Sequence, residues 1–294
     1  MVPCQAGARR PRCATVIRHA SPLGRWELAK ARPAEALQPL VREYVGWYEA
    51  LPQPLRRREL PTEEAPLIIN FGGPFRLFAP GATSGAVDRV SFVTGAFDTY
   101  QVVESVGETQ GVQINFTLLG MRLLVGRPIE DMTNCAVAPE DVFGPFAREL
   151  TGRLYDAASW DLRFDYLDRA LLARLRAAGE LAPAVRHAWE EICRSAGRAS
   201  VRALAKDVGW SHRHFTTRFR HELGVTPKVL ARMMRFARFA RAAQRGAITN
   251  LADAALRYGY FDQSHLHRDA REFAGATPGE LLKVVVPDSG GFIL

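Results

Sequence analysis

Two pairs of histidines in this 294-residue sequence have a spacing that could bind a metal ion. His265 and His267 form one pair, and His212 and His214 form the other. On a β-strand, residues i and i+2 share a face, so both rings could reach one ion. On a helix the two side chains point about 200° apart and cannot share it. The secondary structure around each pair therefore decides between metal chemistry and another role.

Helices are expected at both pairs, because the surrounding sequence is duplicated. ALAKDVGWSHRHFTTRFRHELGVTP (203–227) aligns with AALRYGYFDQSHLHRDAREFAGATP (254–278), with one residue inserted in the second turn. Each copy has the pattern helix, glycine turn, helix, and the second helix is capped by Ser211 or Asp262. In the second copy Leu256 is expected to face inward. Two such copies predict two helix-turn-helix units, in which neither histidine pair chelates a metal.

The apolar positions of each second helix indicate which face stays outside. Phe215 and Phe219 are expected to be buried in the first copy, as are Leu266 and Phe273 in the second. Arginine can donate two bonds to guanine, glutamine can pair with adenine, and threonine can touch the thymine methyl group. The outward faces are therefore predicted to bind DNA through ten residues: His212, Arg213, Thr216, Thr217, Arg220, Gln263, Ser264, His267, Arg268 and Arg271.

The net charge of +8 arises in the half of the chain that contains this duplication. Residues 183–286 hold 18 Lys and Arg against 9 Asp and Glu, whereas residues 1–182 hold 21 of each. A neutral half joined to a basic half indicates a sensor or scaffold attached to a polyanion-binding domain. Between the copies, a helix of about 19 residues, roughly 28 Å long, is expected to begin at Thr226. Its arginines either follow DNA phosphates or face solvent: Arg235, Arg238, Arg241 and Arg245.

The amino-terminal half is expected to be rich in β-structure. Short β-prone runs between residues 66 and 124 are separated by glycine-rich breaks, which is typical of an antiparallel sandwich or small barrel. Helices are predicted at 34–51, 139–154 and 160–178. The predicted fold class is α+β, with four segments: a flexible arginine-rich leader at 1–26, a β-rich cupin-like or jelly-roll-like domain with flanking helices at 27–180, an all-α double helix-turn-helix domain at 183–286, and a tail at 287–294.

The duplicated blocks resemble the AraC/XylS family of bacterial transcription regulators over residues 183–286. The second block is similar to the family's signature, with a Gly-aromatic turn, a Ser-x-Leu core and a closing Gly-x-x-Pro. Ala270 departs from it, because the family usually has Phe there. The resemblance implies base-reading roles for these residues: Arg213, Thr216, Thr217, Gln263, Ser264, His267 and Arg268.

The segments LIINFGGPFRLF, VQINFTLLG and SWDLRFDYLDRALLARL look like the sensor region of a subgroup of these regulators. The resemblance implies a cytoplasmic protein whose partners are promoter DNA, RNA polymerase and an unknown small-molecule effector. It leaves open whether a second copy of the chain is also a partner. Apolar strand residues either line an effector pocket or form the core: Ile68, Phe71, Phe92, Tyr100, Ile114 and Phe116.

Two other functions are open to such a chain. A β-rich domain of this kind could be a metal-dependent dioxygenase or isomerase, but such sites need several imidazoles or carboxylates, and no histidine lies between Ala20 and Arg186. The four scattered cysteines match no zinc spacing. We therefore expect no enzyme, no cofactor and no metal site. An architectural protein that coats DNA without choosing sequence is the second alternative, and the Gln, Ser, Thr and His on the outward faces argue against it. No apolar run approaches the roughly 20 residues of a membrane span.

Overall fold

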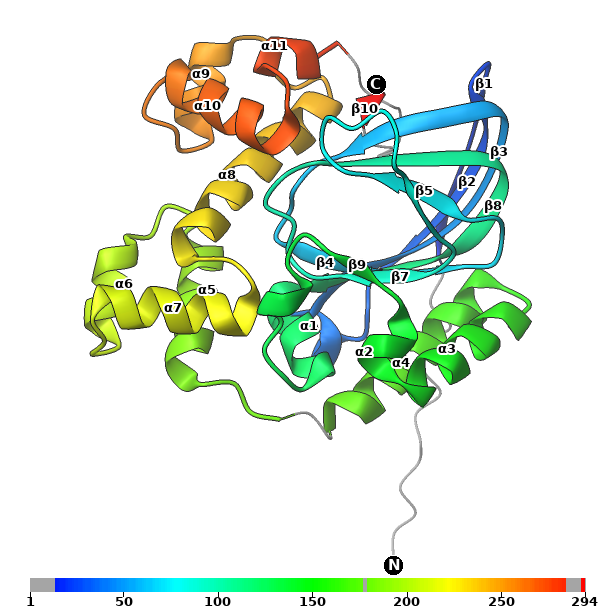
Figure 1. The fold of residues 1–294 in the computed structure, drawn as a ribbon, viewed down its shortest axis with the longest axis horizontal. Coiled ribbons are helices and arrows are strands. Elements are labelled where there is room, and N and C mark those ends of the chain that lie inside the picture. The colour runs from blue at the N-terminus through cyan, green and yellow to red at the C-terminus, as the bar shows by residue number, and fades with distance from the viewer. Residues whose placement is uncertain (1–13, 177–178, 284–291, 294) are drawn as a thin grey trace, which may run out of the picture.

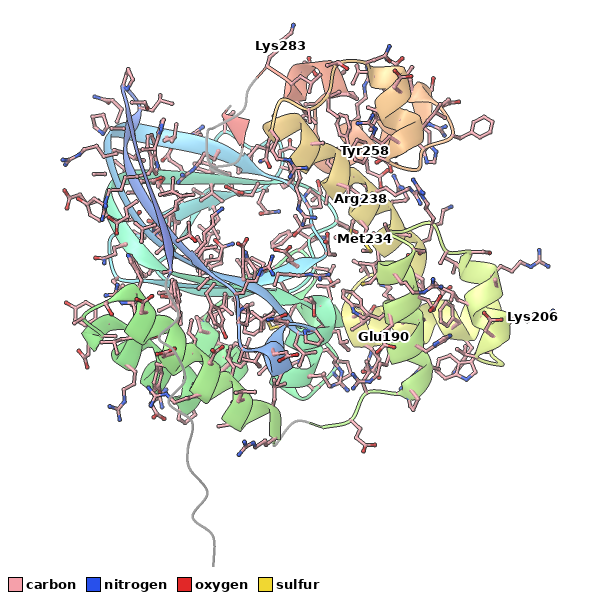
Figure 2. The ribbon with its side chains drawn as sticks, turned by 180° about the vertical axis from the view of Figure 1, so that it is seen from behind. Glu190, Lys206, Met234, Arg238, Tyr258 and Lys283 are labelled. Carbon is pink, nitrogen blue, oxygen red and sulfur yellow. The ribbon has the colours of Figure 1, made fainter. Side chains whose placement is uncertain are left out.

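The computed structural model describes residues 14–176, 179–283 and 292–293. A sheet-rich amino-terminal part, called the sensor part below, lies beside a helical carboxy-terminal part (Figure 1). The long helix α8 (Pro227–Gln244) runs next to the sheet, with one pair of helices at each of its ends (Figures 1 and 2). This arrangement confirms the predicted β-rich domain followed by an all-helical domain.

The ten strands found in the described residues form one antiparallel sheet. Its main order is β1-β2-β3-β8-β4-β7-β9, with β5 paired to β6 and β8, and β10 paired to β3. The two longest strands, β3 and β8, lie at its centre and pair with each other. The strands are β1 (Thr15–Ser21), β2 (Gly24–Ala31), β3 (Val41–Glu59), β4 (Glu64–Asn70), β5 (Phe75–Phe78), β6 (Val87–Arg89), β7 (Phe92–Thr94), β8 (Gln101–Thr117), β9 (Ala136–Val137) and β10 (Phe292–Ile293).

The sheet curls because β8 has different neighbours along its length. Its first half pairs with β5 and its second half with β4, while β3 follows the other side throughout. The β3–β8 register shifts between Leu51 and Leu55, a stretch that contains Pro52 and Pro54. Proline donates no ladder hydrogen bond and is confined to edges and bulges, so it favours a bend at this point. The curled sheet encloses the interior of the sensor part (Figure 1).

The predicted helix at 34–51 is wrong. Only Glu35–Leu37 forms a 3-10 turn (η1), and β3 begins at Val41. Residues on both faces of β3 are at least partly buried, so the strand lacks the polar–apolar alternation that would have revealed it. Gly46 lies directly under the Trp160 ring, which a Cβ would approach to 2.3 Å. The close packing of a helix against this strand therefore depends on the glycine.

The predicted leader at 1–26 is also wrong over the part that the structure describes. Residues 15–21 and 24–31 form the hairpin β1–β2, in which His19 lies opposite Trp26. Strand β1 is at the sheet edge and half or more of its side chains are exposed, so it carries little apolar signal. Residues 1–13 of the predicted leader lie outside the described residues.

The remaining predicted helices of the sensor part are confirmed, with one break. The helix expected at 139–154 is divided at Gly144, which has a positive φ of 58°. The helix expected at 160–178 is present over Trp160–Arg176, and residues 177–178 lie outside the described residues. The helices are α1 (Leu118–Val125), η2 (Glu130–Met132), α2 (Pro139–Phe143), α3 (Pro145–Asp156), α4 (Trp160–Arg176), α5 (Pro183–Arg194), α6 (Val201–Asp207), α7 (His212–Leu223), α9 (Leu251–Arg257), α10 (Gln263–Ala274) and α11 (Pro278–Leu281).

The duplicated sequence forms two similar helix pairs, α6–α7 and α9–α10. Gly209 and Gly259 occupy the two turns with φ of 71° and 86°, a conformation that glycine adopts without strain. The predicted core residues of α7 and α10 are buried, and Ala270 is fully buried with them. Leu256 corrects the sequence prediction, because it is 63% exposed on α9 while Ala254 and Ala255 face the core.

Asp168 of α4 joins the helical layer to the start of β3. Its carboxylate accepts a hydrogen bond from the Ala34 backbone N–H at 2.8 Å and one from the Tyr44 hydroxyl at 3.0 Å. The side chain is only 4% exposed. A buried carboxylate of this kind is stable only when its partners are present.

We predict that Asp168→Ala lowers the free energy of unfolding by about 3 kcal/mol, because it leaves two buried donors without an acceptor. Urea unfolding measures the change. Asp165→Ala, a half-exposed position on the same helix, is the matched control and should shift stability by less than about 0.5 kcal/mol. Equal effects of the two substitutions would contradict the role of Asp168.

Candidate nucleic-acid interface

Helix α7 is oriented by its cap and by its buried aromatic residues. The Ser211 side chain accepts a hydrogen bond from the His214 backbone N–H at 3.2 Å. Phe215 and Phe219 are fully buried, with ring centroids 6.0 Å apart. These contacts fix the rotation of the helix about its axis, so the opposite face points away from the core.

Helix α10 repeats this construction. The Asp262 carboxylate accepts from the His265 backbone N–H at 2.7 Å. Leu266 and Phe273 are fully buried, and the Phe273 ring packs on Phe236 of α8 at 5.5 Å between centroids. A negative side chain at a helix N-terminus also interacts favourably with the helix dipole.

Nine of the ten predicted DNA-binding residues lie on these two outward faces, whereas the hydroxyl oxygen of Thr216 is buried. Gln263 and His267 are neighbours one turn apart, with 3.3 Å between Nε2 and Nε2. Thr216 and His267 are half-buried. The other eight are exposed: His212, Arg213, Thr217, Arg220, Gln263, Ser264, Arg268 and Arg271.

The two histidine pairs do not form metal sites. The His214 ring packs edge-on against Trp210 at 4.7 Å, and the His265 ring packs edge-on against Tyr260 at 5.2 Å. Within the described part of the chain, no group of three or more His, Cys, Asp or Glu side chains is placed to hold a metal ion. One histidine of each pair therefore packs against an aromatic ring, while the other lies on the outward face.

The arginines of α8 serve contacts within the protein more than a phosphate edge. Arg235 donates to the Gly197 carbonyl at 2.6 Å, and the Arg238 guanidinium lies 5.8 Å from the Tyr258 ring centre. Arg241 binds acidic residues of the sheet, which leaves Arg245 as the exposed member of the four. Phosphate contact and simple solvation were the two alternatives for these arginines. Neither describes Arg235, Arg238 and Arg241, which contact other residues of the protein.

The helix-turn-helix domain model matches residues 204–283, which covers most of α6 and all of α7 to α11. The chain carries an AraC-type helix-turn-helix domain. It is a DNA-binding transcription regulator. The matched domain is one of regulators and not of enzymes.

Three solved structures are similar at low identity. ToxT from Vibrio cholerae is 10% identical, with a TM-score of 0.46 over 79% of this chain and 97% of that one. The C-terminal domain of AraT, a response regulator from Geobacillus stearothermophilus, is 18% identical, with a TM-score of 0.34 over 38% and 93%. The AraC-like transcriptional activator CuxR is 10% identical, with a TM-score of 0.31 over 76% and 83%. Identities and TM-scores this low do not define a family. The AraC-type domain is identified by the domain match alone. No curated protein matches the sequence.

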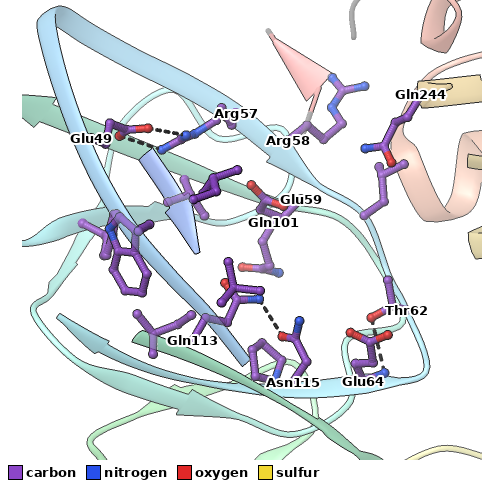
Figure 3. A pocket seen from close by; sticks show the side chains of 18 of the residues that line it. Glu49, Arg57, Arg58, Glu59, Thr62, Glu64, Gln101, Gln113, Asn115 and Gln244 are labelled. Carbon is purple, nitrogen blue, oxygen red and sulfur yellow. Dashed lines mark hydrogen bonds and ion pairs between the residues drawn. The ribbon is translucent and has the colours of Figure 1, made fainter. Parts of the chain in front are cut away.

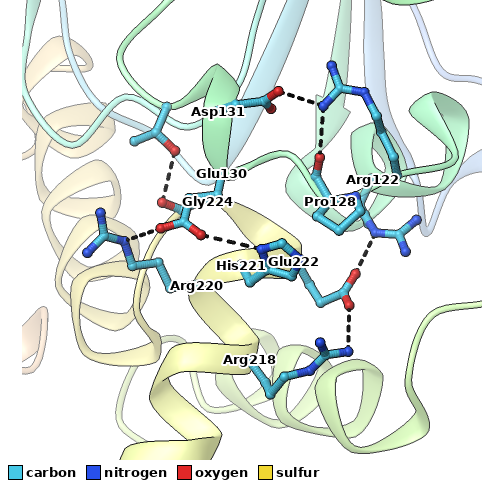
Figure 4. A network of polar contacts seen from close by, with 11 residues as sticks. Arg122, Pro128, Glu130, Asp131, Arg218, Arg220, His221, Glu222 and Gly224 are labelled. Carbon is cyan, nitrogen blue, oxygen red and sulfur yellow. Dashed lines mark hydrogen bonds and ion pairs between the residues drawn. The ribbon is translucent and has the colours of Figure 1, made fainter.

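A buried ion pair joins the AraC-type domain to the sensor part. The Arg122 Nε of α1 lies 2.6 Å from a carboxylate oxygen of Glu222 on α7, and Arg218 of α7 binds the other oxygen at 3.1 Å (Figure 4). The Arg122 and Glu222 side chains are 8% and 6% exposed. Removing one partner of a buried pair typically costs about 3–5 kcal/mol, so this contact holds α7 firmly against α1.

A second, exposed contact involves one of the predicted DNA-binding residues. Glu130 of η2 lies 3.0 Å from Arg220 Nε and 3.5 Å from His221 Nδ1 (Figure 4). The Thr133 hydroxyl donates to the Gly224 carbonyl at 2.9 Å. In this arrangement Arg220 therefore interacts with a carboxylate of the sensor part.

The second helix pair is also tied to the sheet. Arg58 of β3 donates to the carbonyl of Ala274, the last residue of α10, at 2.6 Å. Gly275 follows in a left-handed conformation, where an added Cβ would meet the Tyr100 ring at 2.5 Å. The sensor part thus contacts the carboxyl ends of both α7 and α10 and leaves their amino-terminal halves exposed.

A cavity of about 790 Å³ lies between the curled sheet and α8 (Figure 3). Its walls include Ile68 and Phe92 from the strands and Ala240 and Arg241 from α8. Of the proposed lining residues, only Ile68 and Phe92 face it. Ile114 and Phe116 are fully buried core residues. Volumes of about 300–1,000 Å³ are typical of small-molecule sites.

Ion pairs between Arg241 and two glutamates hold α8 against the cavity. Arg241 lies 3.4 Å from Glu63 and 3.1 Å from Glu64. Burial raises the pKa of Glu64 to about 7, the nearby Glu63 carboxylate raises it as well, and the Arg241 guanidinium opposes both. Sequence reasoning missed these residues, as it missed Arg122, Glu130 and Glu222, because each partner lies about 90 or more residues away along the chain.

We predict that Glu130→Gln raises affinity for DNA about three- to tenfold at low salt, because it frees Arg220 and His221 and removes a negative charge beside them. Stability should change by less than about 1 kcal/mol, since the pair is exposed. Asp131→Asn is the matched control, because Asp131 pairs with Arg127 and not with α7. Titration of labelled DNA measures the affinity. An equal gain in both variants would mean that the change in net charge, and not the release of Arg220, causes the effect.

We also predict a pH dependence that originates at Glu64. Its pKa in the folded protein lies above the ordinary value of 4.5, so the folded protein holds this proton more tightly than the unfolded chain. The stability gained is complete below the ordinary pKa and is lost as the pH rises through about 7. Glu64→Gln should remove about 1–3 kcal/mol of this dependence in urea unfolding between about pH 5 and pH 8. Glu140→Gln, at an exposed position away from the cavity, should not.

Proposed function

We propose that α7 and α10 enter two successive major grooves of one DNA site and read its base edges. The observation that carries this proposal is the matched construction of the two helices, each capped, packed on aromatic residues and left with a polar, arginine-containing outer face. Arg213 and Arg268 occupy the two exposed faces and are assigned to guanine, while Gln263 is assigned to adenine. The other predicted DNA-binding residues supply further base or phosphate contacts.

The length of α8 supports a two-groove geometry. Its 18 residues span about 27 Å at a rise of ~1.5 Å per residue, and successive major grooves lie about 34 Å apart. Its apolar face is buried over the whole length of the helix, with Leu230, Phe236 and Phe239 fully covered. A helix packed in this way acts as a rigid spacer. One chain would then occupy a full site, and a second copy would be optional.

The cavity between the sheet and α8 binds a small-molecule effector in this proposal. A ligand there would touch Ala240 and Arg241 on the same helix that positions both recognition helices. Its binding free energy can favour one placement of α8 over another only through such contacts. The outcome would be a change in promoter binding or in contact with RNA polymerase in the cytoplasm, without a catalytic step.

The test is selection of bound sequences from a random DNA pool. The wild-type chain should select two unlike elements about one helical turn apart. Arg268→Ala should erase preference within one element and Arg213→Ala within the other, each at a cost of about 1–3 kcal/mol. Arg176→Ala, an exposed arginine on α4, is the control for charge and should change neither element.

Two outcomes would contradict the proposal. A uniform loss at every base position would assign Arg213 and Arg268 to phosphate contact. Unchanged affinity after insertion of about five base pairs between the elements would exclude reading of two grooves by a rigid pair of helices.

A further inference from the structure

The basic residues around the cavity are already used within the protein. The Arg57 guanidinium binds both carboxylate oxygens of Glu49, at 2.6 and 3.0 Å. Arg241 is bound to Glu63 and Glu64, and Arg58 donates outward to Ala274. Lys30 also has a partner. A ligand would therefore have to compete with an existing carboxylate for the guanidinium groups of Arg57 and Arg241.

One carboxylate at the cavity, that of Glu59, has no partner within the part of the protein that the structure describes. Glu59, at the end of β3, is an exposed residue that lines the cavity, and its carboxylate has no hydrogen bond or ion pair with any described residue. Figure 3 shows its side chain beside Gln101, which lies directly opposite it on β8. Desolvation by the surrounding protein raises the pKa of this carboxyl, Arg57 lowers it, and Glu49 raises it. A cation bound beside this unpaired carboxylate would pair with it and would oppose the rise in its pKa.

Gln101 adds a second acceptor at the same place. Its side-chain N–H donates to the Tyr100 backbone carbonyl at 3.2 Å, so its side-chain oxygen remains available. An ammonium group has three donors and no acceptor. The Glu59 carboxylate and the Gln101 oxygen therefore match an ammonium group better than they match an anion.

An apolar wall lies close to this polar end. Val103 is two residues from Gln101 along β8, about 7 Å at ~3.4 Å per residue, and it packs against the cluster of Ile68, Phe75 and Phe92. The Trp47 ring packs on Phe75 at 6.1 Å between centroids and also lines the cavity. Aromatic faces hold apolar groups and attract cations.

We propose that the cavity binds an organic cation, an amine carried on an apolar, ring-containing body. The ammonium group lies against Glu59 and Gln101, and the body lies on the wall formed around Phe75 and Trp47. An anion of the same shape would face the Glu59 carboxylate, which repels it. This inference rests on the proposed role of the cavity as the effector site and adds its ligand class.

The test compares three indole compounds of matched size, the cation tryptamine, the neutral tryptophol and the anion indoleacetate. Each is titrated calorimetrically into the full chain near neutral pH. Tryptamine should bind about tenfold or more tightly than tryptophol, and indoleacetate should bind least. Glu59→Gln should weaken tryptamine about tenfold or more and leave tryptophol within about twofold. The exposed Glu140→Gln is the matched control and should bind all three like the wild type.

Thermal unfolding checks that the variant is folded. Because Glu59 is unpaired, Glu59→Gln should be at least as stable as the wild type; if it is not, Glu59→Asp retains the charge and should keep the preference for tryptamine over tryptophol. Equal or tighter binding of tryptophol or indoleacetate overturns the ligand class, as does no binding of any probe or an unchanged tryptamine affinity in Glu59→Gln. DNA selection is measured separately with the same preparation. If the chain still selects two DNA elements but does not bind tryptamine, the proposed DNA-reading function is retained and only the ligand class is rejected.

Discussion

The buried ion pair between Arg122 and Glu222 is the contact on which the relation of the two parts depends. It joins α1, which follows directly from the central strand β8, to α7, which carries half of the predicted DNA-binding residues. Each charge would be costly in the interior without the other, so the pair gives the docked state a specific geometry. Exposed contacts such as Glu130 with Arg220 then adjust a position that the buried pair has already set.

Helix α8 has two roles that are usually carried by separate elements. One face supports α10 through the packing of Phe236 on Phe273, and another closes the cavity with Ala240 and Arg241. A change at the cavity therefore needs no chain of intermediate contacts to reach the helix that supports α7 and α10. The acidic residues that hold Arg241 belong to β4, so the position of this wall is coupled to the sheet.

How much the sequence predicts depends on whether a signal is local. The caps at Ser211 and Asp262, the glycine turns and the helical periodicity lie within single helix pairs, and they predicted the arrangement of α6–α7 and α9–α10 correctly. Strand β3 was predicted as a helix because both of its faces are partly buried and the alternation is lost. Contacts such as Arg122 with Glu222 join residues 100 apart, and nothing in either neighbourhood marks the other. Nine of the ten predicted DNA-binding residues are placed on suitable surfaces, and their contacts with bases stay a prediction.

The short strand β10 changes how the carboxy-terminal part can move. Phe292 and Ile293 pair with Arg58 and Arg57 of β3, so the chain returns to the sensor sheet after leaving it near Arg176. The helical part is consequently anchored at both of its ends. A body tethered twice pivots about the line between its anchors, whereas one on a single linker explores a wide volume. Any rearrangement that preserves this strand pairing must therefore keep both ends of the helical part at the sensor sheet.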